Sequence, residues 1–154
     1  MKKTGLTMLA LVLGLAPLRA VGESAAPLGV GLAEIMLFTQ MRHAKLWLAG
    51  SARNWELADY EIDELKEGFE DAVKHVPTYD GIPVGPMIQS MMTGPIGQVE
   101  AAIKARDSGK FTASFHMLTA ACNSCHAAAN RAFIVIKRPG TSVFPNQSFA
   151  PRRK

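Results

Sequence analysis

Residues 54–77 read NWELADYEIDELKEGFEDAVKHVP, and this stretch decides the fold class. Asn54 is a favoured N-cap residue and Pro77 cannot continue a helix, so the two residues bound one helix that runs to about Val76. The apolar residues between them recur with a period near 3.6, the pattern of an amphipathic helix; they are Leu57, Ala58, Ile62, Leu65, Phe69, Ala72 and Val76. The opposite face is acidic and is expected to lie in solvent; it carries Asp59, Glu61, Asp63, Glu64 and Glu67.

Three further segments show the same period and predict helices over about residues 28–49, 87–106 and 110–131. Gly50 is expected to cap the first of these helices at its C-terminus. Pro95 interrupts the third segment, because a proline removes one backbone hydrogen bond and clashes with the preceding turn. We therefore expect a short helix to Met92 and a restart at the next two residues.

Four amphipathic helices with short connections predict an all-α fold, an antiparallel four-helix bundle. The bundle domain is expected to cover residues 21–132. From Phe133 onward the sequence changes to a short β-branched stretch followed by turn-forming residues. We expect residues 133–154 to form an extended C-terminal tail laid over the bundle.

The first twenty residues, MKKTGLTMLALVLGLAPLRA, have the pattern of a secretory signal peptide. Two lysines precede an apolar run from Met8 to Ala16, and Ala20 marks the expected cleavage zone. The apolar run falls short of the roughly 20 residues that span a bilayer, so stable membrane insertion is not expected. The pattern predicts export to the periplasm.

The charge distribution excludes nucleic-acid binding. The whole chain has a formal net charge of +4, but removal of residues 1–20 leaves 14 basic and 13 acidic residues. Residues 21–136 carry 9 basic residues against 13 acidic ones. A nucleic-acid interface needs basic residues clustered on a folded face, and this body is acidic.

The pentapeptide Cys122-Asn123-Ser124-Cys125-His126 carries the chemistry. C-x-x-C-H is the attachment signature of c-type haem, in which two thiols bond the haem vinyl groups and the histidine binds iron.

A redox dithiol usually opens a helix after a strand, whereas this motif lies deep in the last expected helix. A zinc site wants four ligands, and the sequence offers no second pair, with His75 and His116 expected on the surface. A disulfide across two intervening residues would close a small loop with little entropic gain. Covalent haem is the favoured hypothesis.

A signal peptide, a four-helix bundle and one C-x-x-C-H motif near the end of the last helix resemble the class II c-type cytochromes, the cytochrome c-prime group. The resemblance covers about residues 28–131. It implies that Cys122 and Cys125 carry one covalent haem and that His126 is the proximal iron ligand. Homodimers are common in that family, so the resemblance leaves a homodimer open.

The chain departs from this family in two places. The family usually has a basic residue four positions after the ligand histidine, where this chain has Asn130, with Arg131 next. The family also tends to end soon after that point, whereas this chain continues for about twenty residues.

The distal side of the iron decides the function. In an antiparallel bundle the start of the first helix lies beside the end of the last, and at about 1.5 Å per residue the level of His126 falls on residues 34–36. Met36 lies on the inward stripe there and is the preferred distal ligand. His43, two turns further along, is the second candidate; Met41 and a vacant site are the others.

A methionine ligand gives a six-coordinate haem suited to electron transfer. The expected function is therefore to carry single electrons between redox partner proteins. A vacant distal site would instead give a five-coordinate haem protein that binds nitric oxide or another small gas. A peroxidase-like enzyme would want His43 as a distal base, but the sequence supplies no obvious catalytic dyad, and we expect no enzymatic activity.

Overall fold

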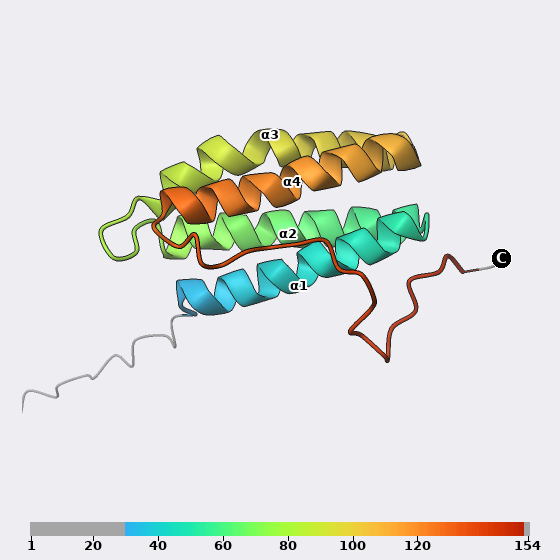
Figure 1. The fold of residues 1–154 in the computed structure, drawn as a ribbon, viewed down its shortest axis with the longest axis horizontal. Coiled ribbons are helices and arrows are strands. Elements are labelled where there is room, and N and C mark those ends of the chain that lie inside the picture. Colours follow the sequence, from blue (N-terminus) through green and yellow to red (C-terminus); the bar gives the residue numbers. More distant parts are fainter. Residues whose placement is uncertain (1–29, 153–154) are drawn as a thin grey trace, which may run out of the picture.

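The computed structural model describes residues 30–152, and in this range the chain forms an antiparallel four-helix bundle (Figure 1). The helices are α1 (Leu32–Ser51), α2 (Trp55–His75), α3 (Val84–Lys104) and α4 (Ser108–Ala128). The described residues contain no β-strand, only one isolated bridge between Tyr79 and Ile82. The all-α bundle predicted from the sequence is confirmed. The expected signal peptide over residues 1–20 lies outside the described residues.

Local signals set the helix ends. The Asn54 side chain caps α2 by accepting a hydrogen bond from the Leu57 N–H at 3.3 Å, as the sequence predicted. Asp107 caps α4 in the same way, accepting from the N–H groups of Gly109 and Lys110 at 3.0 Å each. A carboxylate at a helix N-terminus satisfies free N–H groups and complements the helix dipole. The sequence-based start of α4 at Lys110 was two residues late because it missed this cap.

The end of α4 is a Schellman motif. Asn130 has a φ of 56°, the left-handed conformation that asparagine tolerates better than most residues. The Arg131 N–H bonds the His126 carbonyl at 2.7 Å, and the Asn130 N–H bonds the Ala127 carbonyl at 3.1 Å. The helix therefore ends at Ala128, earlier than the sequence predicted, and the chain turns sharply back toward the bundle.

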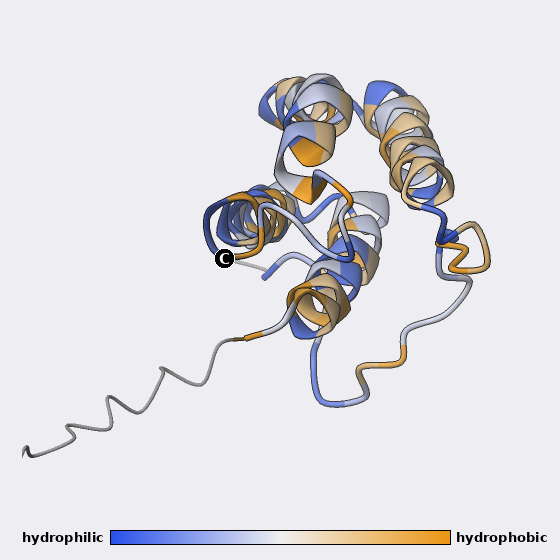
Figure 2. Cartoon of the chain, turned by 90° about the vertical axis from the view of Figure 1, so that its left-hand side faces the viewer, coloured by the Kyte–Doolittle hydropathy of each residue, from blue (hydrophilic) through white to orange (hydrophobic). Residues whose placement is uncertain are grey.

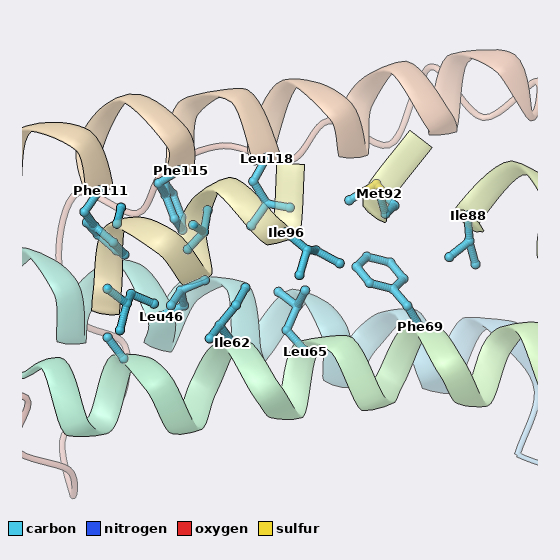
Figure 3. Packing of buried hydrophobic residues seen from close by; sticks show 14 of the residues in the cluster. Leu46, Ile62, Leu65, Phe69, Ile88, Met92, Ile96, Phe111, Phe115 and Leu118 are labelled. Atoms are coloured by element: carbon cyan, nitrogen blue, oxygen red, sulfur yellow. The ribbon is translucent and has the colours of Figure 1, made fainter. Parts of the chain in front are cut away.

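The core joins the four helices along most of their length (Figure 3). Its largest fully buried apolar side chains are Phe111, Phe115, Leu46, Ile62, Leu65, Met92, Leu118 and Val99. Gly50 lies inside α1, not at its C-cap as predicted, and a Cβ there would clash with the Phe111 ring. This glycine is a packing requirement, because only its missing side chain lets the Phe111 ring approach α1.

The predicted break in the third helix is wrong. α3 runs without interruption from Val84 to Lys104 with Pro95 inside it. Pro95 cannot donate to the carbonyl of Met91, which removes one bond from the helix. The buried residues Met92 and Ile96 flank the proline and pack into the core, so tertiary packing holds the helix on both sides of the lost bond.

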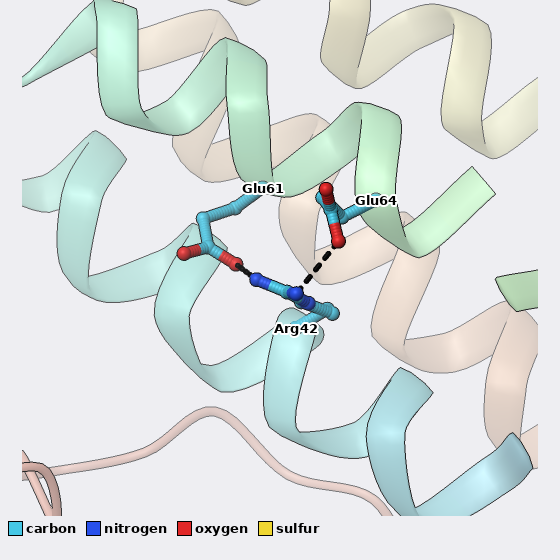
Figure 4. A network of polar contacts seen from close by, with 3 residues as sticks. All are labelled: Arg42, Glu61 and Glu64. Atoms are coloured by element: carbon cyan, nitrogen blue, oxygen red, sulfur yellow. Dashed lines mark hydrogen bonds and ion pairs between the residues drawn. The ribbon is translucent and has the colours of Figure 1, made fainter. Parts of the chain in front are cut away.

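The acidic face of α2 is not wholly in solvent. Glu61, predicted to be exposed there, has a side chain that is only 1% exposed. Arg42 of α1 reaches Glu61 at 3.2 Å and Glu64 at 2.6 Å, and this network ties α1 to α2 (Figure 4). Burial raises the pKa of Glu61, and the hydrogen bond and charge of Arg42 oppose that rise.

We predict that Arg42→Met lowers the free energy of unfolding by about 3 kcal/mol at pH 8, because it leaves a buried carboxylate without its partner. Without Arg42 the pKa of Glu61 rises further, so the folded state holds this proton more tightly than the unfolded state. Stability then falls as pH rises above the unfolded pKa, and the loss in the variant should be smaller at pH 5 than at pH 8.

Urea unfolding at the two pH values measures this effect. Lys66→Met is the matched control, because Lys66 is 39% exposed and pairs with Asp63 and Glu100 at the surface. It should cost less than about 1 kcal/mol at either pH. Equal losses in the two variants would contradict the role assigned to Arg42.

Candidate functional site

α1 and α4 are the neighbouring helices that pack against each other least. Seen end-on, the two helices are set apart, and the chain after Ala128 crosses outside the bundle from α4 toward α1 (Figure 2). A cavity of about 390 Å³ opens between them and reaches Leu65 and Phe69 of α2 and Ile88 and Met92 of α3. Its walls are mostly apolar. This volume lies within the roughly 300–1,000 Å³ of ordinary small-molecule and cofactor sites.

The structure brings the three predicted haem-binding residues to this cavity. Cys122, Cys125 and His126 all line it from the last turns of α4. Positions three and four apart share one helix face, so the motif presents both thiols and the imidazole together. The pattern read from the sequence therefore corresponds to one shared surface.

The two thiols are free and lie in an apolar environment. Burial raises the pKa of Cys122 to about 12 and also raises that of Cys125. Near pH 7 both thiols are therefore protonated. Redox-active and metal-binding cysteines instead have lowered pKa values, usually in electropositive surroundings. Residues 30–152 also contain no group of three or more His, Cys, Asp or Glu side chains placed to hold a metal ion.

A hydrogen bond sets the tautomer of His126. Its Nδ1 lies 3.0 Å from the carbonyl oxygen of Ile134. A carbonyl can only accept, so Nδ1 carries the proton and donates it, which leaves the lone pair on Nε2. Metal-binding histidines commonly donate their other ring N–H to a carbonyl or carboxylate in this way. The Nε2 of His126 therefore keeps the lone pair that any metal ligand at this position would need.

The C-terminal segment is part of the site, which the sequence did not predict. Ile134 and Ile136 line the cavity beside the motif. The Asn123 side chain donates to the Ile136 carbonyl at 2.9 Å and accepts from the Ile136 N–H at 2.7 Å. The sequence did contain a signal for this segment. Residues 133–136 read FIVI, and aromatic and β-branched residues favour extended, half-buried backbone.

Arg131 also reaches the cavity. It lines the wall and forms an ion pair with Asp80 at 2.7 Å. Asp80 lies in the loop between α2 and α3, so this pair ties that loop to the chain just after α4. A basic residue thus stands near the motif although the position four residues after His126 is an asparagine.

His43 fixes the register of α1 against α4. Its Nε2 lies 2.9 Å from Thr119 Oγ1, and the Thr119 hydroxyl donates to the Phe115 carbonyl at 2.9 Å. The hydroxyl therefore accepts from His43, whose Nε2 carries the proton. His43 is buried and its ring packs on Phe115, with ring centroids 4.5 Å apart. Burial lowers the pKa of His43 to about 4, so this imidazole is neutral near pH 7.

The contact between His43 and Thr119 also determines which residue of α4 lies beside Met36. The two helices are antiparallel, so seven residues back from His43 correspond to seven residues forward from Thr119. These steps lead to Met36 on α1 and to His126 on α4. Both residues line the same cavity, as does His43 two turns further in. Met41, the least favoured candidate, is not among the residues of the cavity wall.

Comparison with protein families, with curated proteins and with solved structures gives no match for this chain. Within residues 30–152, no helix has the length and the apolar character needed to cross a membrane. The assignment of the site therefore depends on its geometry and its motif.

We predict that His43 makes stability depend on pH. Its folded pKa is about 4 against an ordinary value of 6.5, so the unfolded chain binds the proton more readily. Stability is complete above pH 6.5 and falls as pH decreases toward 4, by about 2 to 3 kcal/mol at pH 4.5. His43→Gln should lack this loss. His116→Gln, which changes an exposed histidine, should keep it.

Urea unfolding at pH 7 and pH 4.5 compares the three proteins. If His43→Gln loses as much stability on acidification as the wild type, the buried neutral imidazole is not the cause.

Proposed function

We propose that the chain is a periplasmic mono-haem c-type cytochrome that carries single electrons between redox partner proteins. One covalent haem would be held by Cys122 and Cys125, with His126 as the proximal iron ligand and Met36 as the distal ligand. The observation that supports this most is that one apolar cavity receives all three motif residues and has Met36 at the level of His126.

The residues fit the group that the motif implies. The cavity wall is apolar, the thiols are free, and the imidazole keeps its lone pair on Nε2. When bound, haem supplies the iron that alternates between Fe(II) and Fe(III). The chain would fasten and shield it, and an apolar wall with a methionine ligand favours a high reduction potential.

The mouth of the cavity suits contact with another protein. Leu37, Tyr79 and Ile134 line the cavity and are 63%, 42% and 42% exposed. Phe133 and Val135, on either side of Ile134, are 78% and 70% exposed. Exposed apolar groups gathered at a pocket mark interaction surfaces, so this rim is where we expect redox partners to dock.

A peroxidase-like role finds less support. A distal base needs a free imidazole nitrogen within hydrogen-bond reach of the reacting group. With its proton on Nε2, His43 keeps a lone pair on Nδ1, but it lies two turns, about 10 Å along the helix axis, from the level of His126 and so outside that reach. The five-coordinate, gas-binding alternative depends on whether Met36 binds the iron, which the second experiment below decides.

The covalent bond is tested first. The protein produced with a cytochrome c maturation apparatus should gain the mass of one haem. The double variant Cys122→Ser/Cys125→Ser should gain none, because a hydroxyl does not form the thioether. Whole-protein mass spectrometry and the absorbance of the purified protein report the result. A wild-type chain that is colourless and has only its polypeptide mass would refute the proposal.

Met36→Ala tests the distal ligand. In the oxidised wild type we expect the weak far-red absorbance band of sulfur-to-iron charge transfer, and the variant should lose it. Its reduction potential should fall, because methionine ligation raises the potential. Met41→Ala is the control, as it changes a half-buried methionine of the same helix outside the cavity wall, and it should keep the band. A wild type that is already high-spin and binds carbon monoxide rapidly would favour the gas-binding alternative.

A further inference from the structure

The chain after α4 is fastened to the haem-binding motif at two neighbouring points. Asn123 pairs with both backbone groups of Ile136, and two residues earlier the Ile134 carbonyl accepts from His126 Nδ1. We call residues 131–136 the clamp segment. Asn123 and His126 are three positions apart on one helix face, so the segment runs along that face and meets both side chains.

The clamp segment is held at both ends. On one side, Asn130 ends α4 and Arg131 pairs with Asp80 at 2.7 Å. On the other side, the Arg138 guanidinium stacks over Trp47 of α1, 4.7 Å from the ring centroid. Between these points Asn123 is the only side chain of α4 that bonds both the N–H and the carbonyl of one tail residue, within the part of the chain that the structure describes.

The backbone between Ile134 and Ile136 is short and extended. Ile134 and Ile136 line the cavity, while Val135 between them is 70% exposed, which is the alternation of an extended chain. A peptide of two residues leaves little freedom between its ends. Fixing Ile136 on Asn123 therefore also fixes the Ile134 carbonyl, which in turn fixes the orientation and the tautomer of the His126 ring.

We propose that the C-terminal segment is a proximal clamp in which Asn123 is the positioning residue for His126. This inference rests on the proposed function, in which His126 is the proximal iron ligand. A carbonyl that accepts from Nδ1–H makes the imidazole more basic. A more basic ligand stabilises Fe(III), so the clamp should lower the reduction potential and slow exchange of the ring N–H with water.

The decisive variant is Asn123→Ala in the haem-loaded protein. Ser124→Ala is the matched control, because Ser124 is the other variable residue of the motif and is exposed. In Asn123→Ala the His126 ring N–H should exchange with solvent at least about tenfold faster, as expected when two ordinary hydrogen bonds are lost. The reduction potential should rise. The Ser124→Ala protein should match the wild type in both measurements.

Two shortened chains test the same inference without changing the motif. A chain ending at Arg138 keeps the clamp segment and its stacking on Trp47, so it should behave as the wild type. A chain ending at Ala132 lacks the Ile134 carbonyl and the Ile136 backbone groups, so it should reproduce the faster exchange of Asn123→Ala. If Asn123→Ala takes up too little haem to be measured, the two shortened chains still test the clamp.

Nuclear magnetic resonance of the ring N–H and voltammetry provide the two measurements. A general loss of stability would also speed the exchange but gives no reason for the reduction potential to rise, so the clamp requires both changes together. Equal exchange rates and potentials in Asn123→Ala and Ser124→Ala, or in the two shortened chains, would overturn the clamp. A wild-type chain that carries no haem would defeat the proposed function instead. The ring N–H exchange of the haem-free chains would still test the clamp.

Discussion

α1 and α4 touch through aromatic side chains at one end of the bundle and separate at the other. Trp47 packs against Phe111 and Phe115, with ring centroids 6.1 and 5.1 Å away, and His43 packs on Phe115 next to them. Beyond the hydrogen bond from His43 to Thr119 the helices open around the cavity. The hydrogen bond from His43 to Thr119 sets the register, and the level assigned to Met36 depends on it. A shift of one turn would move Met36 about 5 Å along the axis from the level of His126.

Sequence patterns predicted the helices well where the signals were local. α2 was found to within a residue or so because Asn54 caps it and Pro77 follows it. α3 was wrongly divided at Pro95, because the rule for proline weighs one lost hydrogen bond and ignores the packing of Met92 and Ile96. Glu61 was wrongly placed in solvent for a related reason. A one-helix pattern does not contain Arg42, which lies nineteen residues earlier and compensates the buried carboxylate.

At the candidate site, too, sequence patterns predicted the features that depend on one helix and missed those that depend on contacts between distant residues. The spacing of Cys122, Cys125 and His126 needs only one helix, so the sequence alone grouped these three residues. The level of Met36 also followed from counting, since an antiparallel bundle has simple geometry. The hydrogen-bond partners did not follow. Thr119 as the partner of His43, and the backbone of Ile134 and Ile136 as partners of the motif, depend on register and on the path of an irregular segment, which no periodicity encodes.

The two places where the sequence departs from the class II cytochrome pattern that we propose for it form one structural feature. The family pattern that this chain resembles has a basic residue four positions after the ligand histidine and ends soon afterwards. Here that position is Asn130, whose left-handed backbone ends α4 in a Schellman motif. A basic residue that continued the helix would carry the following chain away from the motif. With Asn130 in place, the chain turns back, Arg131 meets Asp80, and the extra residues reach Asn123 and His126. An additional tail without this turn would have no route to His126, and the turn without a tail would supply no carbonyl for its Nδ1–H.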